Sequence, residues 1–174
     1  MLRAVHIFPK FPNLDKIEKL RKKYDSLYGL IPPHITLVFP FESDRSLADL
    51  HTHFVASVDK VRPFKLCVNG ITATSDNYLF LNVTEGSNKI KDLHDRLYTG
   101  ILRGFLNEQI PYTPHITVGR FPYTAALERA FAVTQGFSET FECYVTEITV
   151  ESIKDDQSSV IEFTVPLGIN DFTK

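Results

Sequence analysis

The sequence lacks a long apolar run and a charge excess of one sign. Its 174 residues are 43% hydrophobic and 23% charged, with a formal net charge of −2. No stretch reaches the roughly 20 apolar residues that a membrane-spanning helix needs, and the first residues lack the apolar core of a signal peptide. We therefore expect a cytoplasmic protein with no membrane partner. The length suits one domain.

The small net charge also bears on nucleic-acid binding. A protein that grips many phosphates along a duplex presents a broad basic surface, whereas this chain balances 19 Lys and Arg against 21 Asp and Glu. We expect no binding to double-stranded DNA. A nucleic-acid substrate would be a small nucleotide or the end of an RNA chain.

Cysteines are scarce. Cys67 and Cys143 are the only two, and they lie far apart in the chain. Two thiols make no zinc site, and in a cytosolic chain we expect them to be buried thiols, although a disulfide stays open. A structural metal protein would need more ligands than this sequence offers, so we expect neither a metal nor another cofactor.

A pentapeptide occurs twice. Residues 33–37 read Pro-His-Ile-Thr-Leu and residues 114–118 read Pro-His-Ile-Thr-Val. The flanking patterns repeat as well, each copy giving strand, helix, His-containing strand, helix and strand. We expect strands at 4–8, 64–74, 78–83, 140–150 and 159–165, and helices opening at Asn13, Asp44, Ser87 and Thr124. The last residues, 170–174, read as a frayed tail.

This order predicts an α+β fold in which a duplicated β-α-β-α-β unit forms two pseudo-symmetric lobes around a central cleft. Neither half could bury much core alone, so we expect a single bilobal domain. Lobe one would span about 1–75, lobe two about 76–166, and the tail 167–174. Monomer is the default, because the duplication already supplies a two-fold.

Each pentapeptide places a histidine and a threonine on the same face of a strand, since residues i and i+2 share a face. His34 with Thr36, and His115 with Thr117, would then meet at the cleft if the lobes are related by a two-fold. Two imidazoles can take a proton on one side of a phosphorus atom and give one on the other. Threonine hydroxyls can donate to its non-bridging oxygens. An isolated His-x-Thr on a strand is usually only a packed histidine, so the duplication carries the catalytic interpretation.

At these residues the chain resembles the two-histidine phosphoesterase superfamily, in particular its bacterial 2′-5′ RNA ligase and RNA 2′,3′-cyclic phosphodiesterase branch. That family carries paired His-x-(Ser/Thr)-x motifs about eighty residues apart in a duplicated bilobal fold. The resemblance implies a metal-independent phosphoesterase acting on 2′,3′-cyclic phosphates or 2′-5′ linkages, with 2′-5′ RNA ligation by the reverse path left open. It further implies His115 as base and His34 as acid.

The same resemblance implies that Arg120 binds substrate, because a basic residue often follows the second motif. Strict alternation puts Arg120 on the face opposite His115, so it needs a bulge or a strand end to reach the cleft, which Gly119 makes feasible. Phe39 takes the equivalent place after the first motif. It could stack on a base or fill the core, and we favour the core.

The other histidines give weaker signals. His51 and His53 fall in a helical stretch, where i and i+2 do not share a face. We expect His94 at the surface or the rim, and His6 to be packed or hydrogen-bonded, with a place at the cleft border left open. The rival to the enzyme is a non-catalytic module on the same fold that binds a nucleotide or an RNA end.

Overall fold

The structure is a computed structural model that describes residues 1–168. It contains eight strands, four α-helices and one 3₁₀ helix among these residues. The elements in chain order are β1 (Leu2–Ile7), α1 (Leu14–Tyr24), β2 (Ile35–Glu42), α2 (Leu47–Ser57), β3 (Phe64–Ala73), β4 (Tyr78–Glu85), α3 (Ser87–Leu97), η1 (Gly100–Phe105), β5 (His115–Arg120), α4 (Thr124–Thr134), β6 (Thr140–Val145), β7 (Glu147–Ile153) and β8 (Ser159–Pro166). The expected tail at 170–174 lies outside the described residues.

Two antiparallel four-stranded sheets form the framework, as the α+β prediction requires. One sheet has the order β2-β1-β7-β8 and the other β5-β4-β3-β6. The predicted boundary near residue 75 falls between β3 and β4, which are hydrogen-bonded neighbours in one sheet. Each sheet is therefore built from both halves of the chain, and the sheets do not divide where the sequence repeat does.

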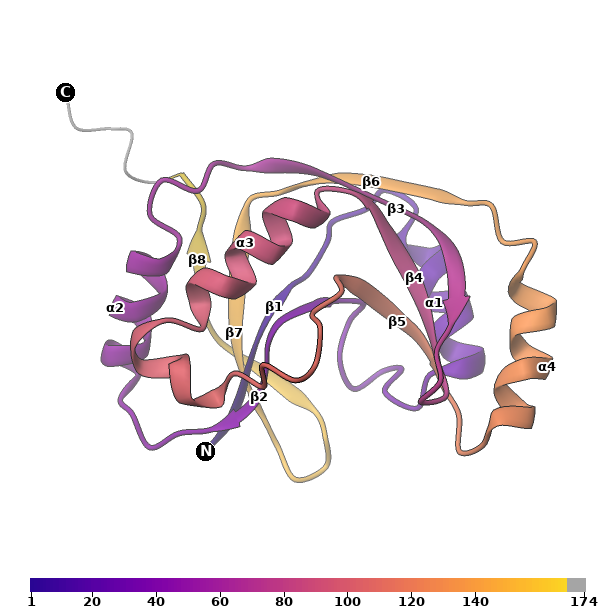
Figure 1. The fold of residues 1–174 in the computed structure, drawn as a ribbon, viewed down its shortest axis with the longest axis horizontal. Helices are drawn as coiled ribbons and strands as arrows, with labels where there is room; N and C mark the ends of the chain where they lie inside the picture. Colours follow the sequence, from indigo (N-terminus) through magenta and orange to yellow (C-terminus); the bar gives the residue numbers. More distant parts are fainter. Residues whose placement is uncertain (169–174) are drawn as a thin grey trace.

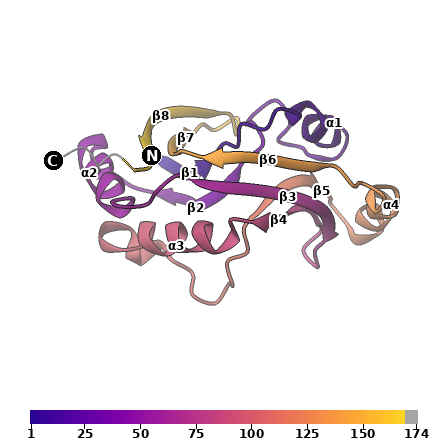
Figure 2. The same cartoon turned by 90° about the horizontal axis from the view of Figure 1, so that it is seen from above.

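Two helices likewise pack against strands from the other half of the chain. Helix α1 packs against β5 of the second half, and α3 packs against β2 of the first. Figure 1 shows α3 running across the sheet that holds β1 and β7, while α1 lies behind β4 and β5. In Figure 2 α1 and α3 lie on opposite sides of the molecule, with α2 and α4 at its two ends. The approximate two-fold thus relates strands and helices together.

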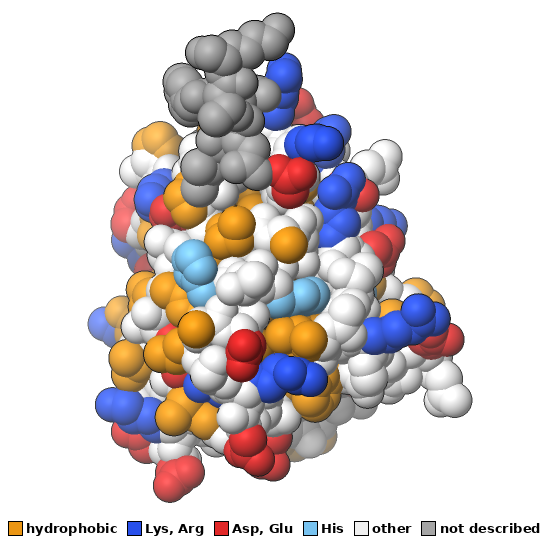
Figure 3. Space-filling view, turned by 90° about the vertical axis from the view of Figure 1, so that its left-hand side faces the viewer, with side chains coloured by type: hydrophobic (Ala, Val, Ile, Leu, Met, Phe, Trp, Pro, Cys, Tyr) orange, Lys and Arg blue, Asp and Glu red, His pale blue; other side chains and the backbone are white. Residues whose placement is uncertain are grey.

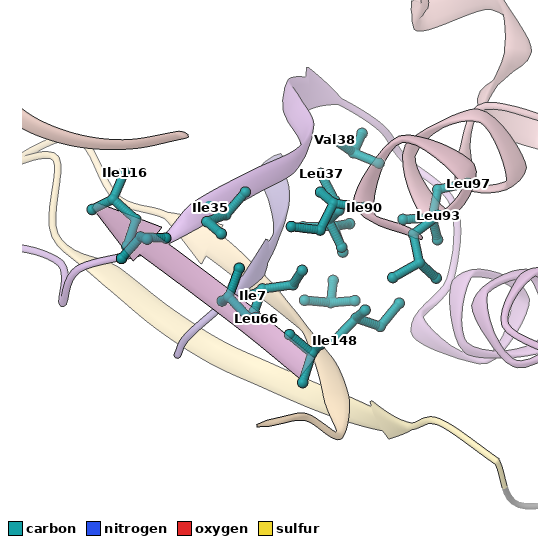
Figure 4. Packing of buried hydrophobic residues seen from close by; sticks show 14 of the residues in the cluster. Ile7, Ile35, Leu37, Val38, Leu66, Ile90, Leu93, Leu97, Ile116 and Ile148 are labelled. Atoms are coloured by element: carbon teal, nitrogen blue, oxygen red, sulfur yellow. The ribbon is translucent and has the colours of Figure 1, made fainter. Parts of the chain in front are cut away.

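One continuous hydrophobic core joins the sheets and the helices. Ile7, Leu37, Leu66, Ile90 and Ile148 come from β1, β2, β3, α3 and β7, and each is at most 2% exposed. Figure 4 shows these side chains packed side by side. Because the core spans both sheets, the chain forms one unit whose parts cannot bury their apolar faces separately.

Several element bounds differ from the sequence-based expectation. The strand expected at 140–150 is two strands in different sheets, because the chain leaves the β3 edge at Val145 and pairs with β1 from Thr149. Ser46 rather than Asp44 caps α2, its hydroxyl accepting from the Asp49 N–H at 3.1 Å. Asn13 is the N-cap residue of α1, as predicted, but its side chain makes no capping hydrogen bond and its amide donates to the Thr140 carbonyl at 3.2 Å.

The described part of the chain holds no helix long and apolar enough to cross a membrane. Figure 3, which faces the α2 end of the molecule, shows acidic and basic side chains interspersed with scattered hydrophobic ones. This face carries no broad field of one sign, which agrees with the balanced composition. Both cysteines are free thiols; Cys67 is buried and Cys143 is half-buried.

Candidate active site

The two motif strands lie next to each other in space. β2 and β5 are edge strands of different sheets, and they contact each other. Ile35 and Ile116, the residues after the motif histidines, are both fully buried in the same core, where Figure 4 shows them. Their neighbours His34 and His115 point to the other face and are half-buried. The duplication therefore brings both motifs to one place.

Each imidazole is held by the same backbone contact. Nδ1 of His34 lies 2.8 Å from the Pro32 carbonyl oxygen, and Nδ1 of His115 lies 2.7 Å from that of Thr113. Because a carbonyl only accepts, Nδ1 carries the hydrogen in both rings. Nε2 is then the nitrogen left to accept or donate a proton during a reaction.

A bulge follows each motif threonine. On β5, Thr117 pairs with Phe80 and Gly119 with Leu79, which leaves Val118 as an extra residue. Val118 and Gly119 are both buried in succession, so the alternation shifts by one. This shift places Arg120 on the face of His115 and Thr117. Such a bulge is what Arg120 was predicted to need in order to reach the site.

The charge of Arg120 reaches both imidazoles. Its guanidinium lowers the pKa of His34 on β2 and the pKa of His115 on its own strand. The contact between β2 and β5, together with the bulge on β5, places the predicted residues His34, His115 and Arg120 in the same region of the fold.

Arg120 is held by a buried carboxylate that the sequence did not single out. Asp25, in the connection after α1, forms ion pairs with Arg120 and with Arg21, the latter at 2.8 Å. The Leu27 N–H also donates to Asp25. Arg21 is 1% exposed and donates further to the Ile31 carbonyl at 2.7 Å. Asp25 therefore links the first half of the chain to Arg120 in the second half through an ion pair.

The threonines lie beside the imidazoles as expected from their spacing. Thr36 and Thr117 are half-buried, and within the described chain neither hydroxyl makes a hydrogen bond. The backbone of Thr36 is fixed by the Tyr112 hydroxyl, which donates to its carbonyl at 2.7 Å. Both hydroxyls are thus free to donate to a bound anion.

Two expectations about aromatic residues were wrong. His94 is buried rather than on the rim, because its Nδ1 donates to the Leu37 carbonyl at 2.8 Å and its ring stacks on Tyr112. Phe39 is 48% exposed rather than in the core. The bulge at Leu37 turns Phe39 outward, in the place that Arg120 takes after the second motif.

A third histidine belongs to this region. His6 on β1 pairs in register with Thr36, and its ring centroid lies 4.4 Å from that of His34. Its Nε2 lies 3.0 Å from Oε1 of Glu151, which is fully buried on β7. The alternation within the first strand could have placed His6 on the site face, but nothing local to the sequence identifies Glu151 as its partner.

Burial sets the protonation of the motif histidines. It lowers the pKa of His34 well below its ordinary value, and the charges of His6, Arg21 and Arg120 lower it further. Burial also lowers the pKa of His115, where the charge of Asp76 opposes the effect. The hydrogen bonds to the carbonyl oxygens favour the protonated form in both. In the free protein both rings therefore favour the neutral form near neutrality.

A surface pocket lies elsewhere, between α1 and the connection from α4 to β6. Its lining includes Lys16, Lys19 and Glu139, and it contains no motif residue. Lys16 is already paired with Glu139, so the pocket offers less chemistry than the paired motifs do. Over residues 1–168, no three His, Cys, Asp or Glu side chains are grouped so as to hold a metal ion.

A family model described as "2'-5' RNA ligase superfamily" matches residues 9–157, which include both motifs. The chain belongs to this superfamily. A protein of Geobacillus thermodenitrificans named "Putative phosphoesterase" is 34% identical over 123 residues, 69% of each chain. A Bacillus cereus relative, also named as a putative phosphoesterase, is 35% identical over 124 residues, 69% of this chain and 70% of that one.

Solved structures extend the superfamily likeness at the level of the fold. The crystal structure of TT0787 from Thermus thermophilus superposes with a TM-score of 0.68 at 16% identity, covering 96% of this chain and 98% of that one. Escherichia coli LigT in complex with 3'-AMP gives a TM-score of 0.60 at 15% identity, covering 97% and 99%. These likenesses show that the chain has the same two-lobed fold.

Proposed function

We propose that the chain is a metal-independent phosphodiesterase that hydrolyses 2′,3′-cyclic phosphates or 2′-5′ linkages of small nucleotides or RNA ends. The observation that carries the proposal is the pairing of His34 and His115, each with its Nδ1 bonded to a carbonyl and its Nε2 left for proton transfer. Two imidazoles supply both proton transfers of an in-line displacement, so the proposal calls on no metal ion.

In this mechanism one imidazole takes a proton from water while the water oxygen bonds to phosphorus. The other gives a proton to the ribose oxygen as its bond to phosphorus breaks. Charge collects on the non-bridging oxygens, where the hydroxyls of Thr36 and Thr117 and the guanidinium of Arg120 are placed to stabilise it. With an RNA 2′,3′-cyclic phosphate and a 5′-hydroxyl in place of water, the same groups would perform 2′-5′ ligation.

The superfamily comparisons support a nucleotide as the ligand class. Structures of E. coli LigT exist in complex with 3'-AMP, ATP, NADP+ and phosphate. The paired motifs and their half-buried, unpaired threonine hydroxyls offer the same chemistry to a phosphate here. A small nucleotide or an RNA end also agrees with the balanced charge of the chain.

A substrate panel tests the proposal. Purified protein is incubated with 2′,3′-cyclic mononucleotides, an RNA oligomer with a cyclic end and a 2′-5′-linked dinucleotide, each with and without EDTA, and products are separated by chromatography. We expect cleavage of at least one class at a rate that EDTA leaves unchanged. Absence of cleavage across the panel contradicts the proposal, and nucleotide binding in calorimetry would then favour the non-catalytic module.

The pH profile gives a second prediction. The base must be unprotonated in the free protein, so kcat/KM falls as the pH falls through its pKa. Since burial lowers the pKa of both His34 and His115 from the ordinary 6.5, we expect the acidic limb to have its midpoint below pH 6.5. The measurement is kcat/KM on a cyclic nucleotide on both sides of that pH. A midpoint above 6.5 would contradict the lowered pKa values.

A further inference from the structure

A helix from the opposite half of the chain lies beside each motif strand, but the contacts that follow each helix differ in chemistry. Asp25 and Tyr98 are the C-cap residues of α1 and α3. Asp25 forms an ion pair with Arg120 at the end of β5, whereas the Tyr98 hydroxyl accepts from the Phe39 N–H on β2 at 3.0 Å. Arg120 and Phe39 follow their motif histidines at the same spacing. The contact is therefore ionic beside β5 and neutral beside β2.

The neutral contacts on β2 come from three rings, His94, Tyr98 and Tyr112, which we call the β2 cluster. The His94 ring stacks on Tyr112 with centroids 3.8 Å apart, and it meets Tyr98 edge-on at 4.8 Å. Tyr112 donates to the Thr36 carbonyl at 2.7 Å, and His94 donates to the Leu37 carbonyl at 2.8 Å. One packed cluster thus holds successive backbone groups of the strand that carries the first motif.

The backbone of β2 is irregular where the cluster contacts it. β2 is an edge strand that pairs with β1. Val5 pairs with Val38 and His6 with Thr36, so Leu37 is the extra residue of a bulge. A bulge interrupts the ladder of hydrogen bonds at its extra residue, and buried backbone groups left out of a ladder bond to side chains or water. The cluster therefore fixes the peptide that sets the direction of the Thr36 side chain.

The contact with Thr36 has no reciprocal at the other motif. Tyr112 lies three residues before His115, and Ile31 holds the equivalent place before His34. Isoleucine has no hydroxyl, so it cannot donate to the Thr117 carbonyl as Tyr112 does to that of Thr36. Burial raises the pKa of Tyr112, so its hydroxyl keeps the hydrogen that it donates. The support of the motif threonines is therefore asymmetric in a way that the sequence repeat does not show.

We propose that Tyr112 is a positioning residue that acts through Thr36. By holding the Thr36 carbonyl, the Tyr112 hydroxyl directs the threonine side chain towards the non-bridging oxygens of the phosphate. Thr113, the next residue in the chain, holds the His115 ring through its own carbonyl. The same short segment therefore orients a histidine of the second motif and the threonine of the first. This inference rests on the function proposed above and adds to it a group that positions the site from outside the two motifs.

A set of double variants tests whether Tyr112 acts through Thr36. Tyr112→Phe keeps the ring that stacks on His94 and removes only the hydroxyl. We expect it to lower kcat/KM on the cleaved substrate about 5–10-fold, the worth of one buried hydrogen bond. In a Thr36→Ala background the same substitution should cost less than about 2-fold, because the side chain that it positions is gone. In a Thr117→Ala background the full loss should remain.

The two threonine backgrounds separate positioning from a structural role. A hydroxyl that only stabilises the fold would cost the same in both, so equal losses overturn the proposal. Thr36→Ser retains a hydroxyl at position 36, and in this background the loss caused by Tyr112→Phe should return. Tyr144→Phe removes the hydroxyl of an exposed tyrosine on β6 and is the matched control, which should leave kcat/KM unchanged.

A measurement without turnover keeps this proposal distinct from the proposed function. The same variants are titrated with inorganic phosphate in a calorimeter, and we expect Tyr112→Phe to raise Kd in the wild type and in Thr117→Ala but not in Thr36→Ala. A wild type that cleaves no substrate of the panel overturns the proposed function, while the phosphate affinities still report on Tyr112. Equal rises of Kd in the two threonine backgrounds, or a wild type that binds no phosphate, overturn the role of Tyr112.

Discussion

Replacing His34 or His115 by alanine lowers kcat on the cleaved substrate about 10²–10⁴-fold, the usual worth of one general acid or base. Each ring has its Nε2 available and its orientation fixed by one backbone carbonyl. Because the two act in one displacement, the double variant should lose little more than the worse single variant. The measurement is kcat and KM for all three variants under saturating substrate.

The controls separate chemistry from folding. His51→Ala removes an exposed histidine of α2 and should leave kcat unchanged. Asparagine at 34 or 115 retains an N–H near the carbonyl and keeps the strand packed, yet supplies no acid or base, so it should be as inactive as alanine. Folding is checked by the urea midpoint of each variant. Full activity in His34→Ala and His115→Ala would remove both from the mechanism.

The sequence predicted the individual strands better than the strands with which they pair. Alternation fixes which face of a strand is buried, but not which strand lies beside it. The repeat therefore predicted the strand at 64–74 correctly and assigned it to the first lobe, whereas β3 pairs with β4 and β6. The strand expected at 140–150 failed for the same reason. The chain passes from one sheet to the other at Thr146, between Val145 and Glu147.

Within the site, residue spacing alone predicted some features correctly. Others depend on tertiary contacts that spacing does not specify. His34 and Thr36 share a face by backbone periodicity alone, and the structure agrees. Phe39 and Arg120 depend on bulges, which strict alternation cannot foresee. Glu151 is 145 residues from its partner His6 along the chain, a separation that follows from the residue numbers. Such a pair forms only because the sheet places β1 beside β7, so it could not be predicted from the sequence.

Replacing Asp25 by alanine lowers the free energy of unfolding by about 3–5 kcal/mol, as removing one partner of a buried ion pair does. Its side chain is 1% exposed and it pairs with Arg21, which is equally buried. Without Asp25, the buried guanidinium of Arg21 keeps Glu18, a partly exposed carboxylate at 3.2 Å, as its anionic partner. Equilibrium urea unfolding measures the change. Asp15→Ala, which breaks the exposed pair with Lys19 on the same helix, should change stability by no more than about 0.5 kcal/mol.

Asp25→Asn separates charge from shape. Asparagine can still accept from the Leu27 N–H, so a loss in this variant measures the ionic part of the contact. Arg120 loses its buried anion in both variants, and we expect kcat/KM to fall under conditions where the variant remains folded. Since Asp25 follows α1 in the first half and Arg120 ends β5 in the second, one carboxylate stabilises the fold and positions the cation that faces both histidines. A variant that loses stability but retains full kcat/KM would show that Arg120 reaches its place without Asp25.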